Sequence, residues 1–163
     1  MNVATFRELL VCLQEIFQNI RDHSGTNIGS VFAQYFPNDG KLSISVSDIG
    51  SGIPEKVRNF LGADPISYAD STALVKACQE NFTTSSHPGN AGKGLADLTL
   101  IITRHYNGKV IIISDYGYVQ YLGRKGKLWV SDRNWLYPGC LIDIEININD
   151  IQEAVESVNE YEW

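Results

Sequence analysis

The chain has 163 residues, of which 44% are hydrophobic, and we expect a single globular domain with a sizeable core spanning 1–163. The formal net charge of −6 argues against a general nucleic-acid binder, which normally presents a basic face. No apolar run approaches the length of a membrane-spanning helix, and the N-terminus lacks a signal-peptide pattern. Cys12, Cys78 and Cys140 show no metal-ligand spacing, which indicates buried thiols and favours a reducing, cytoplasmic compartment.

The first predicted element is a helix. Residues 5–8 (Thr-Phe-Arg-Glu) have the form of a capping box, which marks a helix N-terminus. Apolar residues then recur at helical spacing and predict a stripe that faces the core: Phe6, Leu9, Leu10, Leu13, Ile16, Phe17 and Ile20. The polar segment 24–27 ends this helix.

The later elements alternate between hairpins and helices. In order, the pattern predicts strands over 31–36 and 42–48 joined by the turn 37–40, short helices over 55–61 and 67–80, a polar loop at 83–87, a helix over 93–105, a strand over 109–114, a hairpin of 118–122 and 128–131, a strand over 141–148 and an acidic helix from 150 or 151. Helices and hairpins segregate along the chain. This favours an α+β fold, a two-layer sandwich with helices on one face of a mixed, mostly antiparallel sheet.

The polar side of the first helix carries candidate functional residues. Glu15 and Asn19 are four residues apart, so their side chains are neighbours, and His23 lies near the edge of the same side. In one interpretation this is an ordinary solvated helix face. In the other, the Asn19 amide oxygen ligates Mg²⁺, and the Glu15 carboxylate accepts a proton from an attacking water or hydroxyl group.

A second candidate site begins where the strand 42–48 ends. Asp48 is followed at once by a glycine-rich turn that contains Gly50, Gly52 and Ile53. A carboxylate at this position can accept a hydrogen bond from an exocyclic amine such as that of adenine, and the glycines let a flat base pack close to the backbone. A plain Asp-x-Gly turn is the alternative, but Asp-x-Gly-x-Gly-Ile-Pro after a hydrophobic strand is a more specific pattern.

A third candidate segment opens the helix predicted over 93–105. It consists of Gly89, Asn90, Ala91, Gly92, Lys93, Gly94 and Leu95. Glycines ahead of a helix N-terminus form an anion cradle, because free N–H groups and the helix dipole both point at a phosphate. The segment is not a Walker A loop, since Gly94 follows the lysine and no strand clearly precedes it. A glycine-rich loop that merely caps a helix is the structural alternative.

Together the three segments resemble the boxes of the GHKL ATPase family, which includes gyrase, a class of heat-shock chaperones, mismatch-repair ATPases, bacterial histidine kinases and anti-sigma-factor kinases. The resemblance runs from about residue 5 to residue 148. It implies a histidine-kinase-like ATPase fold that binds ATP or ADP with Mg²⁺, and an ATP lid over about 54–90. The length of the chain is closest to the anti-sigma-type serine kinases, which implies a protein kinase or ATPase domain in bacterial signalling.

The resemblance also implies roles for individual residues. It makes Glu15 the general base, Asn19 the metal ligand and Asp48 the adenine acceptor. It further implies nucleotide contacts from His23, Gly50, Gly52, Ile53, the residues 89–95 and Cys140. Two departures stand out: Lys93 replaces a residue that is more often leucine, and the Cys140 thiol replaces a threonine hydroxyl, a stronger hydrogen-bond donor.

The family does not fix the reaction. Phosphorylation of a histidine, phosphorylation of a protein serine, hydrolysis that drives a conformational cycle, and ATP binding without turnover all remain open. We expect either a stand-alone kinase or a domain of a longer protein, with a protein partner or acceptor domain and a homodimer as one option. The alternative from another class is a nucleotide-free interaction module that docks a basic partner through Glu153, Glu156 and Glu160.

Overall fold

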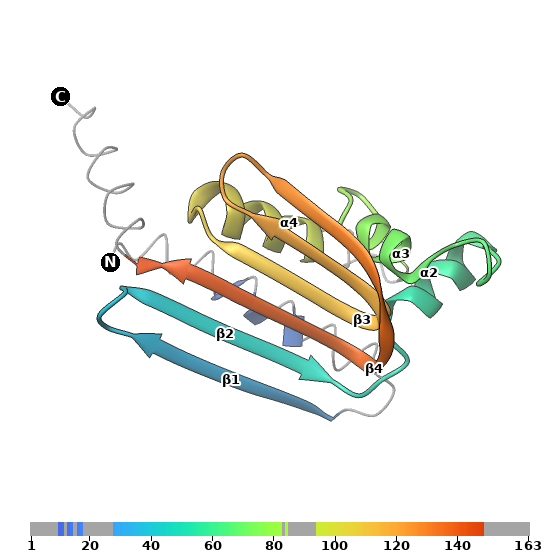
Figure 1. Ribbon diagram of the computed structural model, residues 1–163, viewed down its shortest axis with the longest axis horizontal. Helices are drawn as coiled ribbons and strands as arrows, with labels where there is room; N and C mark the ends of the chain where they lie inside the picture. The colour runs from blue at the N-terminus through green and yellow to red at the C-terminus, as the bar shows by residue number, and fades with distance from the viewer. Residues whose placement is uncertain are drawn as a thin grey trace.

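The computed structural model describes residues 10, 11, 13, 14, 16, 17, 28–82, 84 and 94–148. These residues form an antiparallel sheet of four strands in the order β1-β2-β4-β3 (Figure 1). The strands are β1 (Gly29–Phe36), β2 (Lys41–Asp48), β3 (Lys109–Leu122) and β4 (Lys127–Asn147). The sequence predicted a mixed, mostly antiparallel sheet, and every strand pairing in the described part is antiparallel.

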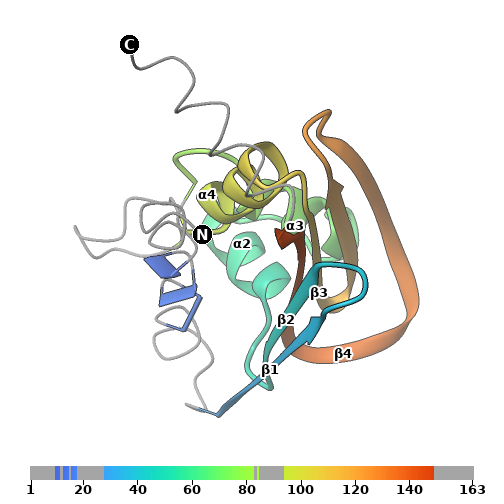
Figure 2. The same ribbon diagram turned by 90° about the vertical axis from the view of Figure 1, so that its left-hand side faces the viewer.

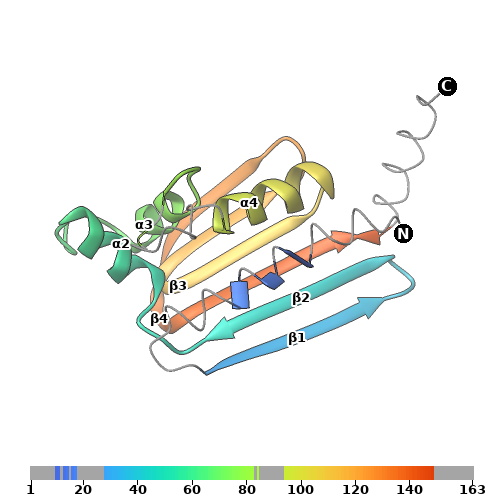
Figure 3. The same ribbon diagram turned by 180° about the vertical axis from the view of Figure 1, so that it is seen from behind.

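The helices lie on one side of this sheet, as the view from behind shows (Figure 3). They are α2 (Ile53–Leu61), α3 (Asp70–Ala77) and α4 (Gly94–Leu100), which continues as the π-helical turn η1 (Ile101–His105). The opposite face of the sheet carries no described helix (Figure 1). The predicted α+β class and its two-layer arrangement are therefore confirmed.

The hydrophobic core fills the space between the sheet and the helices. Along β2, Ile44 and Val46 are buried, while Ser45 between them and the residues on either side of the pair are only partly covered. This is the alternation of a strand with one face on a core. From the helical side, Leu98, Ile102 and Tyr106 are fully buried against the sheet.

Six residues of the first predicted helix are described, and all six are helical. Ile16 is 2% exposed and belongs to the core, with Leu13 packed beside it. Leu10 and Phe17 were predicted to face the core but are 41% and 43% exposed. Phe17 follows Ile16 by one residue, so it lies about 100° further round the helix and outside the buried stripe. The helix start predicted at 5–8 and the acidic helix predicted from 150 or 151 lie outside the described residues.

In the C-terminal half the structure has two long strands, whereas the sequence predicted four short ones. The predicted strands 109–114 and 118–122 fuse into β3, and those at 128–131 and 141–148 fall within or at the end of β4, which curves along its length (Figure 2). The reason is a register shift: Ser114 pairs with Cys140 while the next residue, Asp115, pairs with Tyr137. The two residues between Tyr137 and Cys140 are accommodated as a bulge, so the strand bends without ending.

Polar contacts fix α2 and α3 to the sheet. The guanidinium of Arg58 forms an ion pair with Asp70, and both side chains are largely buried. The other oxygen of Asp70 accepts a hydrogen bond of 3.0 Å from the backbone N–H of Tyr116 on β3. Ser71 donates to Asp132 of β4 from its backbone N–H and its hydroxyl, at 2.9 and 3.0 Å. Of the helices in the described residues, none is long and apolar enough to cross a membrane.

Candidate functional site

Three neighbouring strands bring Asp48, Cys140 and Ser114 into one row. Asp48 ends β2 and pairs with Cys140 of β4, and Cys140 pairs with Ser114 of β3. Residues directly opposite one another on antiparallel strands point to the same face of a sheet. Here that face is the one that carries the helices, since Ser114 and Cys140 are buried. The strand ends therefore place the predicted acceptor Asp48 next to the buried Cys140, with the buried Ser114 one strand further along the row.

The turn after Asp48 is organised by its own carboxylate. The Oδ1 atom of Asp48 accepts a hydrogen bond of 2.8 Å from the backbone N–H of Gly50. Two residues later Gly52 has a φ of +72°, a conformation that favours glycine, and it precedes the first residue of α2. The predicted glycine-rich turn thus connects β2 directly to α2, with Pro54 in the first turn of the helix, where proline is well tolerated.

Ser114 fastens this turn to the sheet. Its hydroxyl Oγ accepts a hydrogen bond of 2.9 Å from the backbone N–H of Ile53 and donates one of 2.5 Å to the carbonyl oxygen of Gly139. The serine is fully buried, so both hydrogen bonds are shielded from water. Ser114 was not predicted as a site residue, because it ends a hydrophobic strand and lies 61 residues from Ile53 in the sequence.

Gly139 lets β4 approach the turn closely. Its φ is +91°, and a Cβ placed on it would lie 2.2 Å from the carbonyl oxygen of Asp48 and 2.7 Å from the backbone N of Gly50. Neither neighbour is a flexible side-chain end, so no residue with a side chain fits here without moving the backbone. The turn after Asp48 is therefore held on one side by the Ser114 hydroxyl and on the other by the backbone of β4 at Gly139.

Charged and thiol groups surround Asp48. Burial lowers the pKa of the Lys56 ammonium on α2, and the nearby Asp48 carboxylate opposes that shift. The pKa of the Cys140 thiol is raised well above its usual range, first by burial and then by Asp48. Cys140 therefore stays protonated at neutral pH and is available only as a weak S–H donor.

Asp115 is a second carboxylate at this site. A Cβ placed on Gly52 would lie 2.9 and 3.0 Å from the two carboxylate oxygens of Asp115, so this side chain lies against the glycine turn. Asp115 has a φ of +52°, in the left-handed region. Burial, followed by the negative charge of Asp70, raises its pKa to about 6, and Arg58 acts in the opposite direction.

The raised pKa of Asp115 predicts a pH-dependent stability. The usual pKa is 3.8 and the folded value is about 6, so the folded state binds this proton more tightly. The resulting stabilisation is complete below about pH 4 and is lost as the pH rises through about 6. Asp115→Asn removes the charge and tolerates the left-handed conformation. We expect the free energy of unfolding of the variant at pH 7 to be higher than that of the wild type by about 1 kcal/mol. This value is reduced because solvent screens the half-buried carboxylate.

The measurement is urea unfolding of both proteins at several pH values from about 4 to 7.5. The difference between them should shrink toward the acidic end, where wild-type Asp115 is protonated. A difference that does not change with pH would mean that the Asp115 carboxylate is not perturbed.

The remaining predicted site residues divide into two groups. Gly94 is the first described residue of α4, and Leu95 packs against the core, so the described part of the helix predicted over 93–105 begins inside it. The others lie outside the described residues: Glu15, Asn19, His23, Gly89, Asn90, Ala91, Gly92 and Lys93. In the part of the chain that is described, no three His, Cys, Asp or Glu side chains group together in a way that would hold a metal ion.

No protein-family model matches the chain, and no curated protein matches it. Solved structures with a similar fold include the N-terminal domain of a DNA repair protein, with 16% identity and a TM-score of 0.47 over 92% of this chain and 39% of that one. The ATPase region of Saccharomyces cerevisiae topoisomerase II has 8% identity and a TM-score of 0.48 over 91% of this chain and 38% of that one. The B-subunit of the DNA gyrase from Myxococcus xanthus has 13% identity and a TM-score of 0.42 over 85% and 36%. The chain spans less than half of each of these structures, and a likeness at this level gives no residue a role.

Proposed function

We propose that the chain is an ATP-binding domain of the histidine-kinase-like type, which transfers or hydrolyses the γ-phosphate in bacterial signalling. The observation that carries the proposal is the fixed position of the Asp48 carboxylate. Asp48 ends a strand, its Oδ1 holds the following turn through Gly50, and the turn is braced by Ser114 and Gly139. A plain surface Asp-x-Gly turn needs no such bracing.

Asp48 has the chemistry to select adenine. An ionised carboxylate has two oxygens and about four acceptor positions, so the hydrogen bond from Gly50 leaves it able to accept another. The exocyclic amine of adenine is a donor, whereas guanine presents a carbonyl oxygen at the equivalent position. Gly50 leaves the backbone without a side chain beside the carboxylate, where a flat base would pack, whereas Gly52 is buried against Asp115.

The phosphate and metal side of the proposal rests on sequence. Asn19 would ligate Mg²⁺, which would neutralise part of the phosphate charge in a protein that is itself acidic. The residues 89–95 would bind phosphate oxygens through backbone N–H groups, and Lys93 would add a positive charge. Glu15 would serve as the general base. The lid predicted over about 54–90 and the protein acceptor belong to the same proposal.

The test of nucleotide binding is the substitution Asp48→Asn. The wild-type chain should bind ATP and ADP with Mg²⁺, and GTP more weakly by about tenfold or more, because the wrong base leaves buried polar groups unpaired. The substituted side chain presents an amide NH₂ group in place of one acceptor oxygen, so ATP affinity should fall by a similar factor. Titration calorimetry with each nucleotide measures both effects.

Asp64→Asn is a matched control for this experiment. Asp64 also accepts a hydrogen bond from a backbone N–H two residues ahead, that of Ile66, but it lies in an exposed turn. This control substitution should leave ATP affinity unchanged. Equal affinity for ATP and GTP in the wild type would refute the role of Asp48. No heat and no thermal shift with any nucleotide would favour the alternative, a nucleotide-free interaction module.

A further inference from the structure

The charged residues of this acidic chain are distributed unevenly. The stretch 104–137 contains six of the thirteen Lys and Arg residues but only two of the nineteen Asp and Glu residues. Of these two, Asp132 accepts hydrogen bonds from Ser71 of α3, and Asp115 lies against the turn before α2. Both carboxylates therefore lie on the side of the sheet that carries the helices. The opposite face of this stretch is locally basic, although the whole chain has a net charge of −6.

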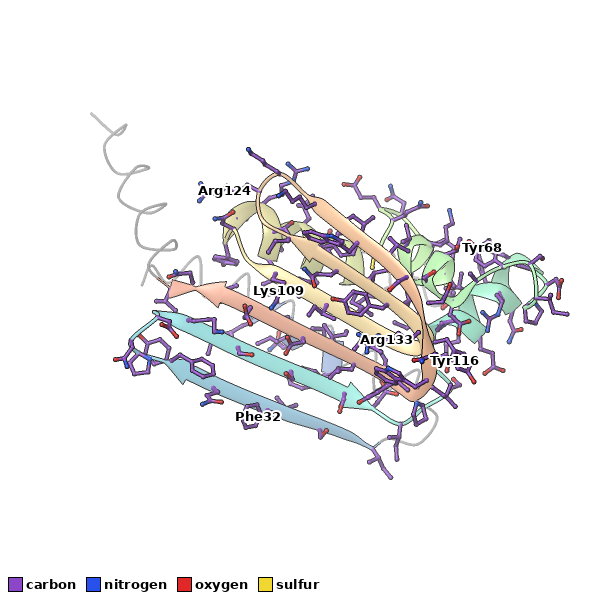
Figure 4. The ribbon with its side chains drawn as sticks, viewed as in Figure 1. Phe32, Tyr68, Lys109, Tyr116, Arg124 and Arg133 are labelled. Atoms are coloured by element: carbon purple, nitrogen blue, oxygen red, sulfur yellow. The ribbon has the colours of Figure 1, made fainter. Side chains whose placement is uncertain are left out.

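Four cationic side chains gather at the turn between β3 and β4. Arg124, Lys125 and Lys127 are exposed there. Arg104 of η1 joins them, because its Nη1 atom donates a hydrogen bond of 2.7 Å to the carbonyl oxygen of Arg124. The backbone N–H of Arg124 in turn donates a hydrogen bond of 3.1 Å to the side-chain oxygen of Asn107. The positive charges are therefore presented on a fixed turn at the end of the sheet, where Figure 4 labels Arg124.

An exposed tryptophan follows this turn on the face of the sheet opposite the helices. Val119 of β3 is fully buried toward the helices, so its neighbours Tyr118 and Gln120 point to the open face. Trp129 of β4 lies opposite Gln120 and shares that face, where it is 46% exposed. The basic turn therefore leads directly to a flat ring that is open to solvent.

Arg133 connects a second tryptophan to this face. Its guanidinium carbon lies 4.5 Å from the centre of the Tyr118 ring and 4.4 Å from the centre of the Trp135 ring, which is cation–π distance for both. Tyr118 is also held at its other end, because its hydroxyl donates a hydrogen bond of 2.5 Å to the side-chain oxygen of Gln120. Trp135 is 45% exposed, and Figure 4 shows Arg133 on the same open face. Cations and exposed rings are thus arranged together before any ligand binds.

We propose that this surface binds single-stranded nucleic acid. The surface, called the ring–cation strip below, consists of Arg124, Lys125, Lys127, Trp129, Arg133 and Trp135. Every nucleotide brings an anionic phosphate and a flat base, and the strip offers cations for the phosphates and exposed rings on which bases stack. Trp129 and Trp135 are six residues apart, at most about 20 Å along a strand. One short oligonucleotide can therefore reach both rings.

Other anionic partners match this surface less well. A membrane surface attracts cations, but insertion requires apolar groups to extend beyond them. Here Arg124 and Lys125 lie at the tip of the turn, and Trp129 lies behind them on the strand. An acidic peptide would pair with the cations and leave the rings exposed. In a nucleic-acid duplex the bases are already stacked on one another, so a single strand is the form that can use the tryptophans.

Two acidic side chains lie on the same face, but along the other half of β4. Glu145 forms ion pairs with Lys109 at 3.1 Å and with Lys41 at 3.5 Å. Asp143 accepts a hydrogen bond of 2.5 Å from the hydroxyl of Ser45. Because Glu145 is flanked by two lysines, its charge does little to repel a phosphate backbone bound along the strip.

The experiment measures binding of a fluorescently labelled oligothymidylate of about 12 nucleotides to the full chain, by fluorescence anisotropy at low salt without ATP. The wild type should bind it, and affinity should fall as salt rises. Trp129→Ala should raise the Kd about tenfold, because one base loses its stacking partner. Lys125→Gln should lower the slope of log affinity against log salt by about 0.7, the value for one phosphate contact on a single strand. Oligouridylate is the second arm, and the tighter of the two identifies DNA or RNA as the preferred ligand.

Phe32→Ala and Lys76→Gln are the matched controls. Phe32 is 61% exposed on the open face but lies on β1 at the far edge of the sheet (Figure 4). Lys76 belongs to α3 on the helix side, where it contacts Gln79. Neither substitution should change oligonucleotide affinity. Urea unfolding of Trp129→Ala should stay close to that of the wild type, which separates a lost contact from a lost fold.

Three results would overturn the proposal. The first is a wild-type chain that binds neither oligonucleotide at low salt, and the second is binding that Trp129→Ala leaves unchanged. The third is binding to phosphatidylserine vesicles that the same substitutions weaken, without oligonucleotide binding, which would make the strip a membrane site. All of these results are independent of the proposed ATP site, because no ATP is present and neither oligonucleotide contains adenine.

Discussion

Gly139→Ala should destabilise the domain by about 3 kcal/mol or more, a large part of the stability of a domain of this size. Two costs add. The residue has a φ of +91°, which an L-residue with a side chain rarely adopts, and the new methyl carbon would lie 2.2 Å from the carbonyl oxygen of Asp48. Because the clash is with backbone, relief requires β4 and the Asp48 turn to separate. ATP binding should then fall as well.

Urea unfolding of wild type and variant measures the change in free energy, and Gly62→Ala is the matched control. Gly62 ends α2 with a φ of +63°, but a Cβ there would meet no atom within 4 Å. The Gly62→Ala variant therefore has the conformational cost alone, and its free energy of unfolding should fall by only about 1 kcal/mol. If the two variants are equally destabilised, β4 does not lie against the turn as the structure describes.

Local patterns account for the parts of the fold that the sequence predicted well. The turn 37–40 joins two runs of strand-forming residues, and the structure has β1 and β2 there, with a hydrogen bond of 3.2 Å from the Asp39 N–H to the Phe36 carbonyl. Asp48 at the strand end and Gly52 before α2 were also predicted from neighbouring residues. Each of these features depends on a few consecutive residues, which a pattern can capture.

The features that local sequence patterns did not predict depend on residues far apart in the chain. Ser114 links Ile53 to Gly139, and Asp115 lies against Gly52, but nothing in the local pattern around 114–115 marks either contact. The long strands β3 and β4 were predicted as separate pieces for a similar reason. A bulge is decided by the register between two strands, and neither strand alone contains that information.

The largest expected effect on catalysis is that of Glu15→Gln. Glu15 lies outside the described residues, and the prediction rests on its spacing of four from Asn19 and on the helical conformation of the described residues around it. The substitution keeps the size of the side chain and removes its ability to accept a proton. Turnover should fall on the order of 10²–10⁴-fold while ATP affinity stays close to that of the wild type. Phosphate release or phosphoryl transfer to an acceptor, together with calorimetry, measures the two quantities.

Glu55→Gln provides the control for this experiment, because Glu55 is an exposed carboxylate in the first turn of α2 and has no proposed role in proton transfer. It should change neither turnover nor affinity. A Glu15→Gln variant with lower ATP affinity and an unchanged rate at saturation would make Glu15 a binding residue. Wild-type turnover in Glu15→Gln, under conditions where the native chain is active, would place the general base elsewhere. If Glu15 is only a solvent-exposed residue of its helix, the substitution changes neither turnover nor ATP affinity. The polar side of the first helix is then an ordinary surface.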